Sequence, residues 1–229
     1  MVLILCIETS GEVCSVALFR DEVLLSKAER FEKNIHASVI TILIEEVIKQ
    51  AGLSLGNLNA IAISKGPGSY TGLRVGVSAA KGLCYALSVP LVSVPTLQAM
   101  AHGFLLKHNI SRSALICPMI DARRMEVFAA IYDSSLNELL SPRAEILTET
   151  SFTDFNHKEI YFTGSGACKM TDLTRHFKNA VIDNSLSPSA LYMGHLAGQA
   201  FKNGLFENVA YFEPFYLKDF VGTGKAGQA

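Results

Sequence analysis

Three polar or glycine-rich turns carry the residues of this chain that are best suited to hold an anionic group. They span residues 8–12, 66–72 and 164–167. Backbone N–H groups, side-chain hydroxyls and the N-terminus of a following helix can all donate hydrogen bonds to phosphate oxygens at such turns. Phosphate binding is therefore the first chemistry that the sequence raises.

The turns at residues 8–12 and 164–167 occupy equivalent points in the two halves of the chain. The first supports two interpretations, an ordinary hairpin and a hairpin that faces a phosphate, and both stay open. Together the two turns predict a degenerate nucleotide cleft with no cofactor beyond weak or vestigial ATP or ADP binding. Only Glu8 and Asp121 are well placed to hold magnesium there. The candidate cleft residues are Thr9, Ser10, Gly11, Gly164 and Gly166.

The turn at residues 66–72 leads from a short apolar strand into a helix. Two glycines bracket Pro67, so the chain leaves the strand through a tight turn that larger residues would resist. The hydroxyl of Thr71 is expected to cap the following helix. These features favour an architectural role, although a helix N-terminus after a glycine turn also suits an anion.

Established nucleotide and metal motifs are absent from the sequence. The glycine turn is not a P-loop, because Gly72 is followed by Leu73. Residues 222–227 match the pattern G-x-G-x-x-G, but no strand precedes them closely and no helix can follow them. The 6 histidines include no pair four residues apart, so no metal site is expected.

The composition indicates an ample core and no membrane span. Hydrophobic residues make up 49% of the 229 positions, and the net charge of -1 gives no electrostatic footprint for nucleic acid. No apolar run approaches the roughly 20 residues that cross a bilayer. The 5 cysteines are widely spaced and odd in number, which favours buried thiols in a cytoplasmic protein over disulfides.

The periodicity of apolar residues predicts two versions of one α/β unit, each beginning with three strands. The first lobe spans residues 1–95 and the second spans residues 96–229, whose C-terminal segment can pack back on the first. Strands are expected at 2–7, 13–19, 22–28, 60–63 and 90–94, and again at 113–120, 126–132, 143–147, 158–163 and 180–182. Helices are expected at 34–51, from the glycine turn to 87, at 96–106, at 169–177 and at 187–202.

Two of the expected helices have surfaces that suit a partner. The helix at 34–51 carries a second apolar stripe of Ile40, Ile44 and Ile48 beside the stripe that covers its sheet. The following helix places Gly72, Gly76 and Ala80 along one side, where another backbone can come close. Close packing on its own sheet explains that side equally well, so both explanations stay open.

Five segments in order resemble one bacterial family. They are Ile7-Glu8-Thr9-Ser10, the run from Gly66 to Arg74, Asp121-Ala122-Arg123-Arg124 with Glu126, Gly164-Ser165-Gly166 and Tyr216-Leu217-Lys218. Over nearly the whole chain they are similar to the TsaB (YeaZ) family of tRNA threonylcarbamoyladenosine biosynthesis. The resemblance implies the actin-like, sugar-kinase-like fold with duplicated βββαβα lobes, in agreement with the doubled α/β unit.

The resemblance also implies that catalytic parts have been lost. TsaB proteins are paralogues of TsaD, the enzyme that transfers the threonylcarbamoyl group to adenosine beside the tRNA anticodon. TsaD holds a metal through two histidines four residues apart, and Thr96 and Met100 stand at those positions here. Neither side chain is a credible replacement ligand. Glu8 stands where the family usually has Asp, which weakens magnesium chemistry further.

The function that the resemblance implies is that of a non-catalytic scaffold subunit. Such a subunit supports TsaD and recruits the ATPase TsaE, contacts tRNA only through the complex, and forms a homodimer when alone. The first-lobe helices are the expected interface, through Ile40, Ile44, Ile48, Gly72, Gly76 and Ala80. The alternative is an autonomous ATP-dependent phosphotransferase of the actin-like fold.

Overall fold

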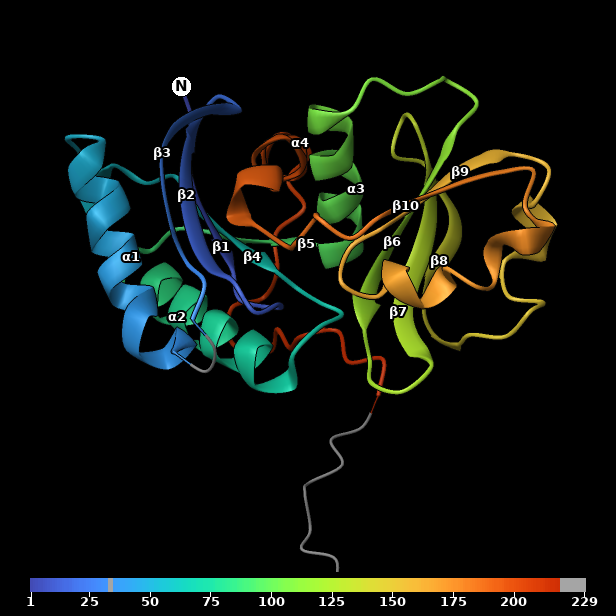
Figure 1. Cartoon of the computed structure of the whole chain (residues 1–229). Helices are drawn as coiled ribbons and strands as arrows, with labels where there is room; N and C mark the ends of the chain where they lie inside the picture. The colour runs from blue at the N-terminus through green and yellow to red at the C-terminus, as the bar shows by residue number, and fades with distance from the viewer. Residues whose placement is uncertain (33–34, 219–229) are drawn as a thin grey trace, which may run out of the picture.

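The computed structural model describes residues 1–32 and 35–218, which form two five-stranded sheets with two helices between them (Figure 1). The first sheet has the order β3-β2-β1-β4-β5, with β1, β4 and β5 parallel and β2 and β3 antiparallel. Every residue of β1 is buried, as its unbroken apolar sequence predicts. Its strands are β1 (Leu3–Glu8), β2 (Cys14–Arg20), β3 (Val23–Arg30), β4 (Ala60–Ser64) and β5 (Leu91–Val94).

The second sheet repeats the topology of the first. Its order is β10-β9-β6-β7-β8, which is the order of the first sheet when β6 to β10 replace β1 to β5. The register repeats as well, because Ile61 lies between Leu5 and Leu91 just as Ile160 lies between Leu115 and Ala180. The expected doubling is confirmed. The strands are β6 (Leu115–Asp121), β7 (Glu126–Asp133), β8 (Glu138–Ile146), β9 (Glu159–Thr163) and β10 (Asn179–Asp183).

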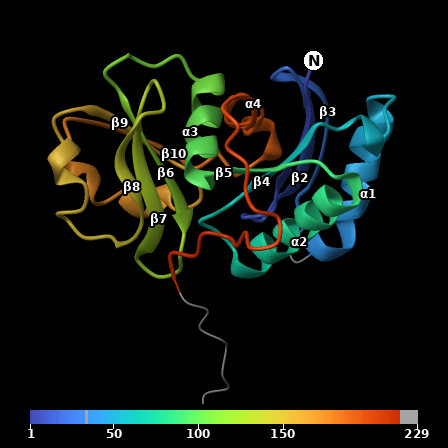
Figure 2. The ribbon, with the colours of Figure 1, turned by 180° about the vertical axis from the view of Figure 1, so that it is seen from behind.

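The helices divide unequally between the two sheets. The helices α1 (His36–Gln50) and α2 (Tyr70–Leu87) cover the outer face of the first sheet (Figures 1 and 2). In the described part of the chain, short 3-10 turns and loops, and no α-helix, cover the outer face of the second. Between the sheets, α3 (Thr96–Lys107) packs on β6 and α4 (Gly194–Lys202) packs on β5 and β1. One buried cluster therefore joins both inner faces, and the division at residue 95 stays a prediction.

The helix expected at residues 169–177 is wrong. Two 3-10 turns, Ala167–Met170 and Thr174–His176, occupy this segment. The hydroxyls of Thr171 and Thr174 donate to the backbone oxygens of residues 168 and 171, at 2.7 and 3.2 Å. Such back-bonding competes with regular helical hydrogen bonds, which helps to explain why the segment does not become an α-helix.

Other element boundaries differ in smaller ways. Ser69, and not Thr71, caps α2, because the Ser69 hydroxyl accepts the N–H of Gly72 at 3.2 Å. The strand expected at 143–147 begins earlier, as β8. The helix expected from 187 divides into a 3-10 turn (Ala190–Tyr192) and α4. The expected start of α1 at Asn34 and the glycine pattern at 222–227 lie outside the described residues.

No helix in the described part of the chain has both the length and the hydrophobicity that a membrane crossing requires.

Candidate functional site

A polar cluster lies where the parallel strands β1 and β4 end. Because parallel strands place their carboxyl ends at one edge of the sheet, Glu8, Thr9 and Ser64 come together there with Thr96 from the start of α3. None of the four is accessible to solvent. The hydroxyls of Ser64 and Thr96 lie 2.5 Å apart, and Thr96 Oγ1 also accepts the N–H of Gly66 at 3.1 Å.

Glu8 is held in this cluster as a buried carboxyl. Its Oε1 accepts the N–H of Ser10 at 2.6 Å, while Oε2 has no hydrogen-bond partner among the described residues. Burial raises the pKa of Glu8, and the hydrogen bonds from Ser10 offset that rise only in part. The same burial encloses the carboxyl away from solvent, which makes it a poor magnesium ligand.

The glycine side of α2 closes over the turn at residues 8–12. A Cβ at Gly72 would overlap the backbone oxygen of Thr9, and a Cβ at Gly76 would overlap Thr9 Oγ1. The N–H of Ser69 also donates to the backbone oxygen of Ser10 at 2.7 Å. Of the two explanations left open by the sequence, packing within the chain is the one that these contacts support.

The six predicted interface residues are consequently placed differently from expectation. Gly72, Gly76 and Ala80 face the interior of the first lobe, so they are not free to contact a partner. Ile40, Ile44 and Ile48 are only 3, 5 and 7% exposed and belong to the core between the first sheet and its helices.

The outward faces of α1 and α2 carry features that sequence reasoning did not single out. Ile42 is 56% exposed on α1. On α2, Ser78 and Gly82 are exposed, and no described atom outside the local helix lies within 4 Å of a Cβ built at Gly82. A hollow of about 530 Å³ lies between the helices, with Ile44 and Leu83 among its walls.

The glycine turn at residues 164–167 is packed as tightly as the turn at residues 8–12. Gly164 has φ +104°, and a Cβ there would lie 2.5 Å from the backbone oxygen of Met119. Its N–H donates to the backbone oxygen of Asp183 at 2.9 Å, and the ring of Pro188 contacts the turn at Gly11. Five residues span at most about 18 Å, so the segment between Asp183 and Pro188 brings the two turns near each other.

The candidate cleft residues thus lie in one region but are occupied by protein contacts. Thr9 and Ser10 are buried under α2, Gly11 lies against Pro188, and Gly166 lies against Val127. Nucleotide binding at these residues stays a prediction.

Asp121, the other predicted magnesium ligand, already has partners. It is exposed at the end of β6, and its Oδ1 lies 3.0 Å from Lys169 Nζ. The same oxygen accepts the N–H of Arg123 at 2.6 Å. The lysine neutralises the carboxylate, which lowers its value as a cation ligand.

The positions of the two TsaD histidines do not fit a metal. Thr96 is buried with its hydroxyl hydrogen-bonded to Ser64 and Gly66, and Met100 is buried with its terminal methyl group beside Gly164. Across residues 1–32 and 35–218, no group of three His, Cys, Asp or Glu side chains could hold a metal ion.

A C-terminal strap, residues 205–218, connects the two lobes and was not predicted in this form. It runs beside α2 toward the start of β7 in Figure 2. The N–H of Phe215 donates to the backbone oxygen of Lys65 at 2.7 Å, and the ring of Tyr216 lies 4.8 Å from that of Tyr70. Lys218 then forms an ion pair with Glu126 of the second lobe.

Comparison with known proteins connects these contacts to a family. The family model described as TsaD, tRNA N6-adenosine threonylcarbamoyltransferase, matches residues 30–220. The tRNA threonylcarbamoyladenosine biosynthesis protein TsaB of Escherichia coli is 31% identical over 97% of both chains. The solved structure of YeaZ from Pseudomonas aeruginosa has 26% identity and a TM-score of 0.77, covering 95% of this chain and all of that one.

A more distant structure supports the fold alone. The ethanolamine utilization protein EutJ from Carboxydothermus hydrogenoformans is 9% identical, with a TM-score of 0.52 over 84% of this chain and 89% of that one. The expected actin-like fold with two related lobes is confirmed. The chain therefore belongs to the TsaB family of tRNA threonylcarbamoyladenosine biosynthesis proteins.

Proposed function

We propose that this chain is a non-catalytic, cytoplasmic subunit of the assembly that makes N6-threonylcarbamoyladenosine in tRNA. In that assembly it supports a TsaD-type transferase and helps to recruit TsaE, and tRNA contacts it only through the complex. The observation that carries the proposal is the outward surface of α1 and α2, which combines exposed Ile42 with the open glycine Gly82.

Gly82 is informative because it lowers the stability of α2 and no contact inside the chain requires a glycine there. Glycine within a helix costs about 1 kcal/mol relative to alanine. At Gly76 the close approach of Thr9 offsets this cost, but at Gly82 no described atom beyond the local helix lies near enough to require glycine. A second backbone packed against this face would explain the residue, because only small side chains let two helices approach closely.

The same surface has the other properties of an interface. Ile42 is an exposed aliphatic side chain on the neighbouring helix, and the hollow between α1 and α2 is walled by Ile44, Ile48 and Leu83. An apolar centre with charged residues around it, here Glu45 and Lys49, is the usual composition of a protein–protein contact. We infer that the transferase occupies this face in the complex and a second copy occupies it when the chain is alone.

The inner face of the first lobe supports the non-catalytic part of the proposal. The two positions that would carry metal ligands hold Thr96 and Met100. Thr96 accepts a hydrogen bond from Gly66, and Met100 packs beside Gly164. Glu8 begins the turn at residues 8–12 that α2 covers, and its carboxyl is buried. The alternative of an autonomous phosphotransferase requires tight Mg-ATP binding with turnover, which calorimetry on the isolated chain tests directly.

The interface is tested by co-purification with the transferase from the same organism. Ile42→Glu and Gly82→Arg should each weaken the complex, because they place charge or bulk on the contact surface. Leu139→Glu is the matched control, since Leu139 is 48% exposed on β8 in the other lobe. Normal co-purification of both α1 and α2 variants, with all three variants folded, would overturn the interface assignment.

A further inference from the structure

The turn between β6 and β7 presents two arginines that its own fold does not require. Arg123 and Arg124 both have left-handed backbone conformations, with φ 72° and 47°. Glycine and asparagine suit such positions, whereas longer side chains adopt them at a conformational cost. Both side chains are exposed, and neither has an ion pair or a hydrogen bond among the described residues. The formation of the turn therefore does not explain why it contains two arginines.

The carboxylates beside this turn are already neutralised by lysines. Asp121 Oδ1 lies 3.0 Å from Lys169 Nζ, and Glu126 forms an ion pair with Lys218 of the strap. The ammonium of Lys169 also donates to the backbone oxygen of Glu126 at 2.8 Å, which holds the base of the turn in place. Because the lysines balance the carboxylates, the charges of both arginines are uncompensated.

The strap extends this positive surface toward α2. Figures 1 and 2 show the end of the strap beside the turn between β6 and β7, and its Lys218 contacts that turn. Two residues earlier, the ring of Tyr216 packs on that of Tyr70, and the exposed guanidinium of Arg74 lies 5.5 Å from the centroid of the Tyr70 ring. Glu213 is an exposed acid on the same part of the strap. Cations alternating with aromatic rings are typical of surfaces that bind nucleic acid.

We propose that Arg123 and Arg124 bind backbone phosphates of the tRNA when this chain is in the complex with the transferase. The inference rests on the proposed function, which supplies tRNA as the polyanion. A guanidinium group matches two oxygens of a phosphate with paired N–H donors. Contacts of this kind hold and orient the RNA without reading its sequence.

The composition of the surface favours RNA over an acidic protein as its occupant. Protein interfaces have an apolar centre with charges around it, whereas interfaces with nucleic acid are more polar and much more positive. In the turn, Met125 is 45% exposed, and it lies between two arginines and an ion-paired glutamate. The net charge of -1 does not oppose the contact, because salt limits charge interactions to about 8 Å at physiological ionic strength.

Two arginines bind RNA only weakly by themselves, because counterions compete for each phosphate at physiological salt. In the complex, the transferase holds the tRNA and thereby raises its effective concentration at the turn. A contact that is negligible for the isolated chain then adds to the affinity of the assembly. The proposal thus agrees with tRNA reaching this chain only through the complex.

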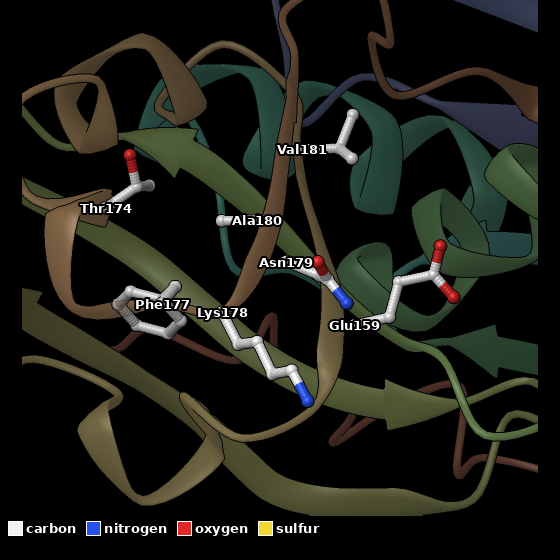
Figure 3. A pocket seen from close by; sticks show the side chains of 7 residues that line it. All are labelled: Glu159, Thr174, Phe177, Lys178, Asn179, Ala180 and Val181. Carbon is white, nitrogen blue, oxygen red and sulfur yellow. The ribbon is translucent and has the colours of Figure 1, made fainter.

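The test compares three double variants of the full chain in the reconstituted complex. Arg123→Asn with Arg124→Gly removes both guanidinium groups and introduces residues that suit positive φ, so the fold is retained. Arg123→Lys with Arg124→Lys keeps both charges. Arg112→Asn with Lys178→Asn is the matched control, because these exposed cations precede β6 and β10, at the opposite edge of the sheet. Figure 3 shows Lys178 there, beside a hollow of about 520 Å³.

Fluorescence anisotropy with labelled tRNA measures the affinity of each complex over a range of KCl concentrations. The Asn–Gly variant should bind at least about tenfold more weakly at about 0.15 M salt, and the slope of log affinity against log salt should fall by about 1.4–1.8. The lysine variant and the control should keep the slope of the parent protein, because the slope reports how many phosphates are neutralised. All three should co-purify normally with the transferase.

Unchanged affinity and slope in the Asn–Gly variant would overturn the proposal, as would an equal loss in the control or a reduced slope in the lysine variant. A folded Asn–Gly variant that no longer co-purifies with the transferase would also overturn it, because a protein would then occupy the turn. A thermal unfolding scan verifies folding. If the parent chain forms no complex with the transferase, the proposed function fails and this contact fails with it.

Discussion

Two glycines on one helix provide a quantitative test of the packing described for α2. Gly76 and Gly82 both lie inside Tyr70–Leu87, so replacing either with alanine gives the same gain in helix propensity, about 1 kcal/mol. Their surroundings differ. A Cβ at Gly76 would overlap Thr9 Oγ1 and lie 3.0 Å from Ile63 Cδ1, whereas a Cβ at Gly82 meets no described atom within 4 Å beyond the local helix.

The expected changes in the free energy of unfolding therefore have opposite signs. Gly82→Ala should stabilise the monomer by about 0.5–1 kcal/mol, because alanine also restricts the unfolded chain. Gly76→Ala gains the same amount but overpacks a site where Thr9 and Ile63 are both fully buried. Overpacking costs about 1–3 kcal/mol and sometimes more. An overlap with fixed neighbours belongs at the upper end, so the expected net loss is about 2 kcal/mol.

Urea denaturation followed by far-ultraviolet circular dichroism measures this difference, at a protein concentration where the chain is monomeric. The two variants should differ by about 3 kcal/mol, equivalent to about 6–12 °C in melting temperature for a chain of this size. Equal effects of the two substitutions, or a stabilised Gly76→Ala, would refute the assignment of the buried glycine side. Under the proposed function, Gly82→Ala should also weaken the complex with the transferase while it stabilises the isolated chain.

Three further predictions concern local contacts. Burial raises the folded-state pKa of Glu8 above its unfolded value, so the stability that Glu8 contributes is complete below the unfolded pKa and is lost as pH rises through the folded pKa. Glu8→Gln should remove this pH dependence and be more stable than the parent protein at about pH 8. Urea midpoints that fall in parallel for both proteins between about pH 5 and pH 8 would contradict this prediction. Ser69→Ala should cost about 1 kcal/mol by removing the cap of α2 while Thr71→Ala costs much less, and denaturation that ranks them the other way would restore Thr71 as the cap. Lys81 donates to two backbone oxygens of the strap, at 3.0 and 3.2 Å. Lys81→Met should therefore loosen the strap and increase hydrogen exchange at the Phe215 amide. Unchanged exchange there would show that the strap does not depend on Lys81.

The doubled topology could be predicted because it rests on strand patterns that are local in the sequence. The unbroken apolar run of β1 and the turns that separate β6 from β7 specify strands without knowledge of the rest of the chain. The segment at 169–177 failed because its threonines bond to nearby backbone groups, a preference that competes with an apolar pattern compatible with a helix.

The site was harder to predict because it depends on which side of a helix meets its own sheet. Periodicity placed Gly72 and Gly76 on one side of α2 but did not say what lay against that side; only the contact with Thr9 does so. The signal for Gly82 was present in the sequence, as a helical glycine off that side, but its meaning depends on the open space around it. The strap has no periodic pattern, so its contacts with Lys65 and Glu126 could not be predicted.

The most direct test of the proposed function is reconstituted threonylcarbamoylation of tRNA with the TsaD-type transferase, TsaE and the threonylcarbamoyl-adenylate donor. Modification should require this chain, be restored by the parent protein and by Leu139→Glu, and be strongly reduced with Ile42→Glu. Full modification without the chain, or full activity of a folded Ile42→Glu variant, would contradict a scaffold that acts through the outer faces of α1 and α2.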